Sequence, residues 1–238
     1  MRPHAAFLLL AACAPTYAPP VRAIHGGAPR PTLGSLQIDV ADADGVVPGV
    51  AGRLPLSEHL AAEVGGDVAA DFAPDLGASW KMGHAGLRAS TALGDRLAAD
   101  LDLGGGVGSG GAHAVAGEDN SKAANALAWG GYLGGGIGGH GDFVGLYART
   151  LVELTASRDD RLPITRWGSL IGGVQFGSGG GARVRIAAGA AVYDNQREAR
   201  AAPILEIGLE LGGGPAPPPP PEPPARHWRQ YRRHHRLP

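Results

Sequence analysis

The sequence predicts an all-β protein, an antiparallel up-and-down β-barrel of about ten strands, with eight strands as a smaller possibility. Apolar and polar residues alternate with a period of two in successive segments, and this period points alternate side chains of a strand to opposite faces. Short turns and longer polar connections alternate between these segments. The chain has 238 residues, a length that suits one barrel domain.

The expected strands cover residues 35–40, 46–54, 60–69, 78–92, 96–108, 125–138, 143–155, 167–176, 182–193 and 204–211. The range 143–155 shows the pattern best, because Val144 and Leu146 fall on one side while Tyr147, Arg149 and Glu153 fall on the other. The connections at 56–59, 93–95, 139–142 and 177–181 carry the Gly, Asp and Ser of hairpin turns. The remaining connections, 41–45, 70–77, 109–124, 156–166 and 194–203, are expected to be longer loops.

Both ends of the chain differ in composition from the barrel domain, which we place at residues 33–211. Residues 1–12 are predicted to be a signal peptide, because a positive charge precedes a short apolar stretch. Residues 13–32 contain five prolines and no apolar period, which favours an extended tether. Residues 212–225 are a Pro-rich linker of polyproline II type, and residues 226–238 are a basic tail.

Cys13 is the last residue of a short motif. The run Leu10-Ala11-Ala12-Cys13 resembles the lipobox of bacterial lipoproteins, which implies that Cys13 is acylated and becomes the mature N-terminus. Ordinary secretion with cleavage after Ala23 is the alternative. Because the chain holds one cysteine, it has no intramolecular disulfide.

Two paired segments carry a family resemblance. The ranges Gly52–Ala69 and Ala89–Gly106 have a strand–turn–strand rhythm, and residues 35–211 resemble the small bacterial outer-membrane β-barrels, the class that includes the OmpA-type membrane domain. The resemblance implies short periplasmic turns and longer external loops. With ten strands, both termini would then be periplasmic. The chain departs from the class at Leu211, where such barrels usually end in an aromatic residue.

The polar face of the strands predicts a lumen. An Arg or Lys at the bilayer midplane costs about 2–4 kcal/mol, so charges on these strands must point inward in a membrane. In a barrel of this size, arginines and carboxylates would pair and fill the interior. This predicted lumen charge network consists of Asp39, Arg53, Glu63, Asp67, Asp100, Asp102, Arg149, Glu153, Arg183, Arg185, Glu206 and Glu210. The alternative is a soluble periplasmic lipoprotein barrel, in which these charges form the water-exposed outer surface and the barrel binds an apolar ligand.

The sequence shows no catalytic or metal-ligand pattern. The histidines lack the spacing of metal ligands, and no cofactor is expected. Ser79 and Ser90 share a strand with His84 but not the spacing of a nucleophile and its base. We therefore expect a protein that is not an enzyme, with a barrel enzyme acting on lipid as a weaker alternative.

The basic tail suggests a partner. Its arginines, which alternate with aromatic and histidine side chains, are Arg226, Arg229, Arg232, Arg233 and Arg236. The tail carries +5 and the whole chain −1, so the remainder carries −6. Such a tail binds anions, and in an exported protein we expect cell-wall polymer or anionic lipid, not nucleic acid. The sequence thus predicts a plugged outer-membrane barrel, in contact with membrane lipid, with a structural or interaction role.

Overall fold

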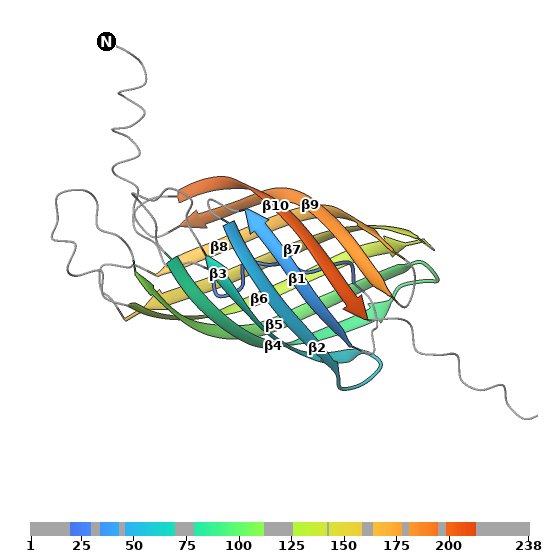
Figure 1. Cartoon of the computed structure of the whole chain (residues 1–238), viewed down its shortest axis with the longest axis horizontal. Helices are drawn as coiled ribbons and strands as arrows, with labels where there is room; N and C mark the ends of the chain where they lie inside the picture. Colours follow the sequence, from blue (N-terminus) through green and yellow to red (C-terminus); the bar gives the residue numbers. More distant parts are fainter. Residues whose placement is uncertain are drawn as a thin grey trace, which may run out of the picture.

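Ten antiparallel strands close into one barrel (Figure 1). The computed structural model describes residues 20–29, 34–42, 46–69, 79–111, 126–141, 143–158, 164–177, 181–194 and 199–212. Neighbouring strands follow the order β1-β10-β9-β8-β7-β6-β5-β4-β3-β2, and β2 returns to β1. The all-β fold class and the ten-stranded barrel predicted from the sequence are therefore confirmed.

The strands begin and end within a few residues of the predicted ranges, with one exception. They are β1 (Ser35–Asp42), β2 (Val46–Pro55), β3 (Leu60–Ala69), β4 (Ser79–Ala92), β5 (Leu97–Gly111), β6 (Ala126–His140), β7 (Val144–Ser157), β8 (Thr165–Phe176), β9 (Ala182–Asp194) and β10 (Ala199–Gly212). The exception is β10, which begins five positions before the predicted start at residue 204. The sequence prediction places residues 194–203 in a longer loop, whereas Pro203 lies within β10 although proline lacks a ladder donor. Instead β9 extends to Asp194, and Ala199 pairs with it.

The two ends of the barrel differ in their connections. We call the end with the turns 56–59, 93–96, 141–143 and 177–181 the turn end, and the opposite end the loop end. β1 begins and β10 finishes at the turn end, where Ser35 lies opposite Gly212. At the loop end, the connections 43–45 and 195–198 are as short as the turns, because the flanking strands are longer than predicted.

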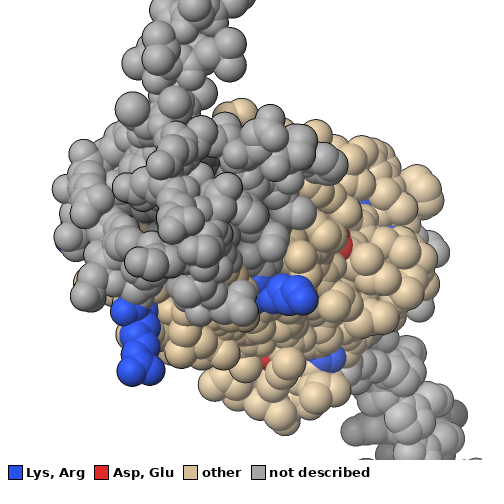
Figure 2. Space-filling model, turned by 60° about the vertical axis from the view of Figure 1, so that its left-hand side comes forward, with Lys and Arg blue, Asp and Glu red and all other residues tan. Residues whose placement is uncertain are grey.

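The outside of the barrel is apolar. Large exposed apolar side chains occur on every strand, for example Leu101, Leu133 and Ile207. In Figure 2 the wall is largely free of charged side chains. The exposed charged residues among those with a described side chain lie near strand ends or in turns, and they are Glu58, Lys81, Asp95, Arg96, Arg158 and Arg166.

The inside of the barrel is polar. Along β7 the burial alternates strictly from Val144 to Thr155, with the even-numbered residues exposed and Arg149 and Glu153 buried. The same period places charged side chains on the inner face of other strands, such as Arg185 on β9 and Glu206 on β10. The barrel is thus inverted relative to a water-soluble protein, with its apolar face outside.

Residues 20–29 lie inside the barrel, and we call them the lumen segment. The segment is visible as the blue trace within the ring of strands in Figure 1. Val21, Arg22 and His25 have at most 3% of their surface exposed. The sequence placed these residues in a tether leading to the domain. The structure differs here: the described part of that tether bends at Val21, Gly27 and Ala28, with a positive φ at Gly26, and packs within the domain, because the strand side chains bind its backbone. Among the described residues, none belongs to a helix long and apolar enough to span a membrane.

Candidate functional site in the barrel lumen

The lumen wall binds the backbone of the lumen segment. The carboxylate of Glu153 accepts hydrogen bonds from the N–H groups of Val21 (2.7 Å) and Arg22 (3.3 Å). Asp67 accepts one from the N–H of Ala23 at 3.0 Å. The wall therefore satisfies backbone groups that have no strand partner, as buried amides require.

The same pattern continues toward the turn end. Glu206 accepts a hydrogen bond from the N–H of His25 at 3.1 Å. The side-chain oxygen of Gln175 accepts one from the N–H of Ala28 at 3.1 Å. Arg149 donates to the carbonyl oxygen of Gly27 at 3.2 Å. Carboxylates and one amide oxygen bind the donors of the segment, and a guanidinium binds an acceptor.

Arg22 joins the segment to two carboxylates of the wall. Its Nη2 lies 2.8 Å from Oε1 of Glu63, and its Nη1 lies 3.1 Å from Oδ2 of Asp102. Its Nε donates to the carbonyl of Ile24 at 3.0 Å, and its guanidinium lies 5.1 Å from the ring centroid of Tyr132. Each nitrogen of the guanidinium thus has a partner, and the charge of Arg22 is compensated inside the barrel.

Wall residues also pair with one another. Arg149 bridges two carboxylates on β5, with 2.7 Å to Asp100 and 2.7 Å to Asp102. Arg53 lies 2.8 Å from Glu63. Each pair joins strands that are adjacent or separated by one strand. The pairs therefore link the strands of the barrel through its interior.

A second group of pairs lies around β9, β10, β1 and β2. Arg185 on β9 pairs with Asp39 on β1 and, at 3.5 Å, with Glu206 on β10. Glu210 lies 3.9 Å from Arg53 on β2. The contacts of Arg185 with Asp39 and of Glu210 with Arg53 cross the β1–β10 seam, where the barrel closes.

His25 lies between two walls of the lumen. Its Nδ1 is 3.3 Å from Oε2 of Glu206, and its Nε2 is 2.6 Å from Oγ of Ser169 on β8. A serine, an imidazole and a carboxylate in this order have the connectivity of a nucleophile, its base and the group that orients the base. The same contacts also hold the segment at the centre of the barrel.

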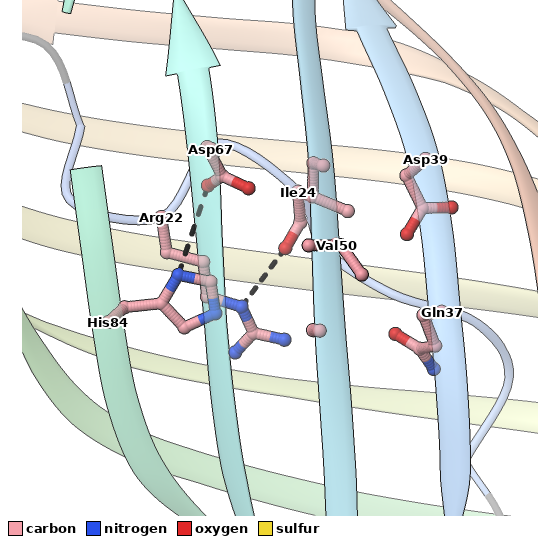
Figure 3. A pocket seen from close by; sticks show the side chains of 8 residues that line it. Arg22, Ile24, Gln37, Asp39, Val50, Asp67 and His84 are labelled. Atoms are coloured by element: carbon pink, nitrogen blue, oxygen red, sulfur yellow. Dashed lines mark hydrogen bonds and ion pairs between the residues drawn. The ribbon is translucent and has the colours of Figure 1, made fainter. Parts of the chain in front are cut away.

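A small cavity lies beside the segment, between β1, β2, β3 and β4 (Figure 3). Its volume is about 10 Å³, the room that one water molecule needs. His84 lines it, 3.9 Å from Asp67, and neither ring nitrogen has a hydrogen-bond partner among the described residues. A buried water here would satisfy the ring.

Glycines on the inner face make room for the segment. A Cβ added at Gly130 would lie 2.9 Å from Cγ1 of Val21, and a Cβ added at Gly106 would lie 3.1 Å from Cβ of Val21. At the turn end, a Cβ at Gly138 would lie 3.0 Å from Cδ of Pro29. The glycine-rich strands β5 and β6 thus leave space for a chain in the lumen.

The structure buries all the residues of the predicted lumen charge network on the inner face of the strands. Sequence reasoning missed Arg22, His25 and Arg88, which belong to the same clusters; Arg88 lies 2.8 Å from Asp102. The period of two on β4 could have identified Arg88, because Met82 and His84 share its face. Arg22 and His25 had no such signal. Cys13, the signal peptide and the arginines of the basic tail lie outside the described residues.

Ser90 and His84, considered above for catalysis, are not brought together as a nucleophile and base in any described contact, and the side chain of Ser79 is not described. Among the described residues, no group of three or more His, Cys, Asp or Glu side chains could hold a metal ion. The Ser169–His25–Glu206 arrangement was not anticipated from the sequence.

No family model matches the chain, and no curated protein matches it. Several solved structures are similar in shape. The β domain of the Bordetella autotransporter BrkA is 12% identical with a TM-score of 0.48, and the match covers 76% of this chain and 99% of that one. The KdgM porin is 8% identical with a TM-score of 0.35, and the match covers 75% of this chain and 98% of that one. The N-terminal β-barrel of Pseudomonas aeruginosa OprF is 6% identical with a TM-score of 0.34, and the match covers 75% of this chain and 96% of that one. These are outer-membrane β-barrels, and at such identities the likeness concerns the fold alone.

Proposed function

We propose that this protein is an outer-membrane β-barrel whose lumen is closed by residues 20–29, with a structural or interaction role and no open pore. The observation that carries the proposal is the inverted distribution of side chains. Large apolar residues cover the outside, and charged residues fill the inside and bind the lumen segment.

The apolar exterior supports the membrane over the soluble alternative. A water-soluble monomer rarely exposes an apolar patch of more than about 300–600 Å². Here every strand exposes large apolar side chains, and the charged ones stay near the strand ends. An apolar ligand would also compete with the lumen segment, because Ala28 of the segment already packs against the apolar cluster of Tyr147, Ile171 and Ile204.

The contacts of the lumen segment support a closed barrel. Its backbone binds Glu153, Asp67 and Glu206, and Arg22 forms ion pairs at 2.8 and 3.1 Å. A segment held by this many buried polar contacts leaves the lumen only if they all break. Ion flow through the barrel should therefore be small.

The ends of the chain complete the proposal. We propose that residues 1–12 are removed, that Cys13 is acylated, and that Arg226 and its neighbours in the basic tail contact cell-wall polymer or anionic lipid. The ion pairs of Arg22 favour processing at Cys13 over cleavage after Ala23, because the latter would remove Arg22 from the lumen. The mass of the mature protein distinguishes the two.

Two measurements on outer membranes of Gram-negative cells expressing the full chain test the proposal. A folded membrane barrel resists SDS until heated, so the unboiled and boiled protein should migrate differently. The purified barrel in planar bilayers should show rare, small conductance steps. Extraction by carbonate without a heat shift would contradict the membrane placement, and steady large channels would contradict the closed lumen.

The Ser169–His25–Glu206 arrangement favours a second candidate function, a hydrolase whose nucleophile faces the lumen. The Oγ–Nε2 distance of 2.6 Å is within the range for proton transfer from a serine to its base. A fluorophosphonate probe should then label the wild type and not Ser169→Ala. Absence of labelling in the folded wild type would leave His25 with the role of holding the segment.

A further inference from the structure

We propose that the lumen is a binding channel for an extended polypeptide, occupied by residues 20–29, and that it carries the chain from the loop end to the turn end. The residues before Pro20 would then be displayed on the outer face of the membrane, opposite the C-terminal tail. This inference rests on the proposed outer-membrane placement.

The direction of the lumen segment follows from its neighbours. Val21 lies beside Gly130 and binds Glu153, both in the half of their strands nearer the loop end. Pro29 lies beside Gly138, two residues before β6 ends at the turn end. β1 begins at the same turn end with Ser35. The chain therefore enters from the loop end, crosses the interior, and reaches β1 at the far side.

The length of the segment fits this crossing. Ten residues of extended chain reach at most about 33–36 Å. The apolar band of an outer-membrane barrel is about 25 Å tall. A single extended segment can therefore pass through the whole apolar height of the wall.

The lumen wall recognises a polypeptide through its backbone. Four N–H groups of the segment, those of Val21, Ala23, His25 and Ala28, donate to wall side chains at 2.7–3.1 Å. The carbonyl of Gly27 accepts from Arg149 at 3.2 Å. A simple ion lacks this row of amide donors, and a sugar lacks its regular spacing along a chain.

The formal charge of the wall favours a cationic segment. Among the described buried residues, the strands contribute eight carboxylates and five arginines, an excess of three negative charges. Arg22 pairs with two of these carboxylates, Glu63 and Asp102. Both also pair with arginines of the wall, Glu63 with Arg53 and Asp102 with Arg88. The occupant of the channel is thus matched to the wall by charge as well as by its backbone.

The crossing conflicts with the sequence-based expectation that both termini are periplasmic. If the loop end is external, Pro20 lies at the outer opening of the barrel, and Cys13 precedes it by seven residues. Seven residues reach at most about 25 Å, and the way back through the lumen is filled. A lipid on Cys13 could then not enter the inner leaflet at the turn end while the segment occupies the lumen.

Epitope insertion into the full chain tests this topology. One epitope follows Tyr17, a second follows Glu118 in the connection between β5 and β6, a third follows Gly94 in a tight turn, and a fourth follows Pro238. On intact cells, antibody should bind the first two; the other two should be labelled only after the outer membrane is permeabilised. Each insertion is checked for the heat shift of the folded barrel.

The outcomes separate the inference from the proposed function. An epitope after Tyr17 that is absent, or labelled only in permeabilised cells, while the Glu118 epitope is labelled on intact cells, would overturn the inference alone. A Glu118 epitope that stays hidden on intact cells would overturn the proposed orientation of the barrel.

Occupancy of the lumen is tested without an insertion. The thiol of Val21→Cys should resist maleimide in the unboiled barrel and react after boiling, because Val21 is 0% exposed. Leu56→Cys, in a turn and 59% exposed, is the matched control and should react in both states. The parent chain, which holds Cys13, provides the background. Equal reaction of both variants in the unboiled barrel would show that the segment does not occupy the lumen.

Discussion

Arg22 and Glu63 form an ion pair of 2.8 Å inside the barrel, with 2% of each side chain exposed. One lies on the lumen segment and the other on β3, so this contact joins an element without strand partners to the wall. The pair is not isolated, because Glu63 also binds Arg53 and Arg22 also binds Asp102. The lumen segment is thereby part of the charge network.

Replacing Arg22 with Met should destabilise the folded barrel. A buried ion pair that loses one partner costs about 3–5 kcal/mol when the other charge is left unpaired. Here Glu63 keeps Arg53 and Asp102 keeps Arg88, so we expect a smaller loss, about 1.5–3 kcal/mol, from the hydrogen bonds of the guanidinium. The measurement is the temperature at which the unboiled band disappears from an SDS gel. As a control, Arg166→Ala removes an exposed pair with Asp194, and such pairs contribute about 0–1 kcal/mol. Equal effects of the two variants would contradict the role of Arg22.

Replacing Val21 with Trp should open the lumen. Val21 is 0% exposed and lies against glycine-lined strands, so an indole has no room beside Gly106 and Gly130. The wall itself is unchanged, and the barrel should still fold while the segment leaves. Single-channel recordings should show frequent, larger conductance steps. Val64→Trp, on the outer face of β3 and 60% exposed before the change, should leave the conductance at the wild-type level.

Replacing Glu153 with Ala should weaken the binding of the segment to the lumen wall and lower the free energy of unfolding of the barrel. Its carboxylate accepts two backbone N–H groups, and leaving buried donors unsatisfied costs about 1–3 kcal/mol each. Glu153→Gln keeps an accepting oxygen and should lose less stability. The free energy of unfolding in urea, measured in detergent micelles, tests both. Glu58→Ala, in an exposed turn, is the control; a loss as small as that of Glu58→Ala would place Glu153 outside the segment-binding wall.

A variant that lacks residues 20–29 should conduct ions, and a synthetic peptide with the sequence of those residues should block it. The peptide carries Arg22, which pairs with Glu63 and Asp102 in the intact chain. A peptide with Glu in place of Arg22 should require at least about tenfold higher concentration for half block, a difference of about 1.4 kcal/mol. Equal block by both peptides would show that charge does not select the occupant.

The strands were predictable from the sequence because their period is a local property. Arg149 and Glu153 lie on the same face of β7 because they are four residues apart on one strand. A barrel with an apolar exterior must turn this charged face inward. The boundaries were less predictable, as β10 shows: its residues before Pro203 form a strand because β9 offers them partners up to Asp194.

The lumen segment was not predictable in the same way. Its burial depends on contacts with distant strands, since Val21 binds Glu153 and His25 binds Glu206. Its backbone has no period to reveal a buried face, and its prolines resemble those of an exposed tether. Arg22 even contributed to a plausible cleavage site. Only the closed barrel brings these partners together.

The seam between β1 and β10 has a consequence for assembly. β1 has eight residues and is the shortest strand, and it follows the lumen segment after a few residues. If the other nine strands first form an open sheet, the segment can settle against its inner face and the sheet can then curl around it. Pairing of Ser35 with Gly212 would lock the segment in place as the last step. The chain would thus be enclosed laterally, and no free end would need to find its way through a finished ring.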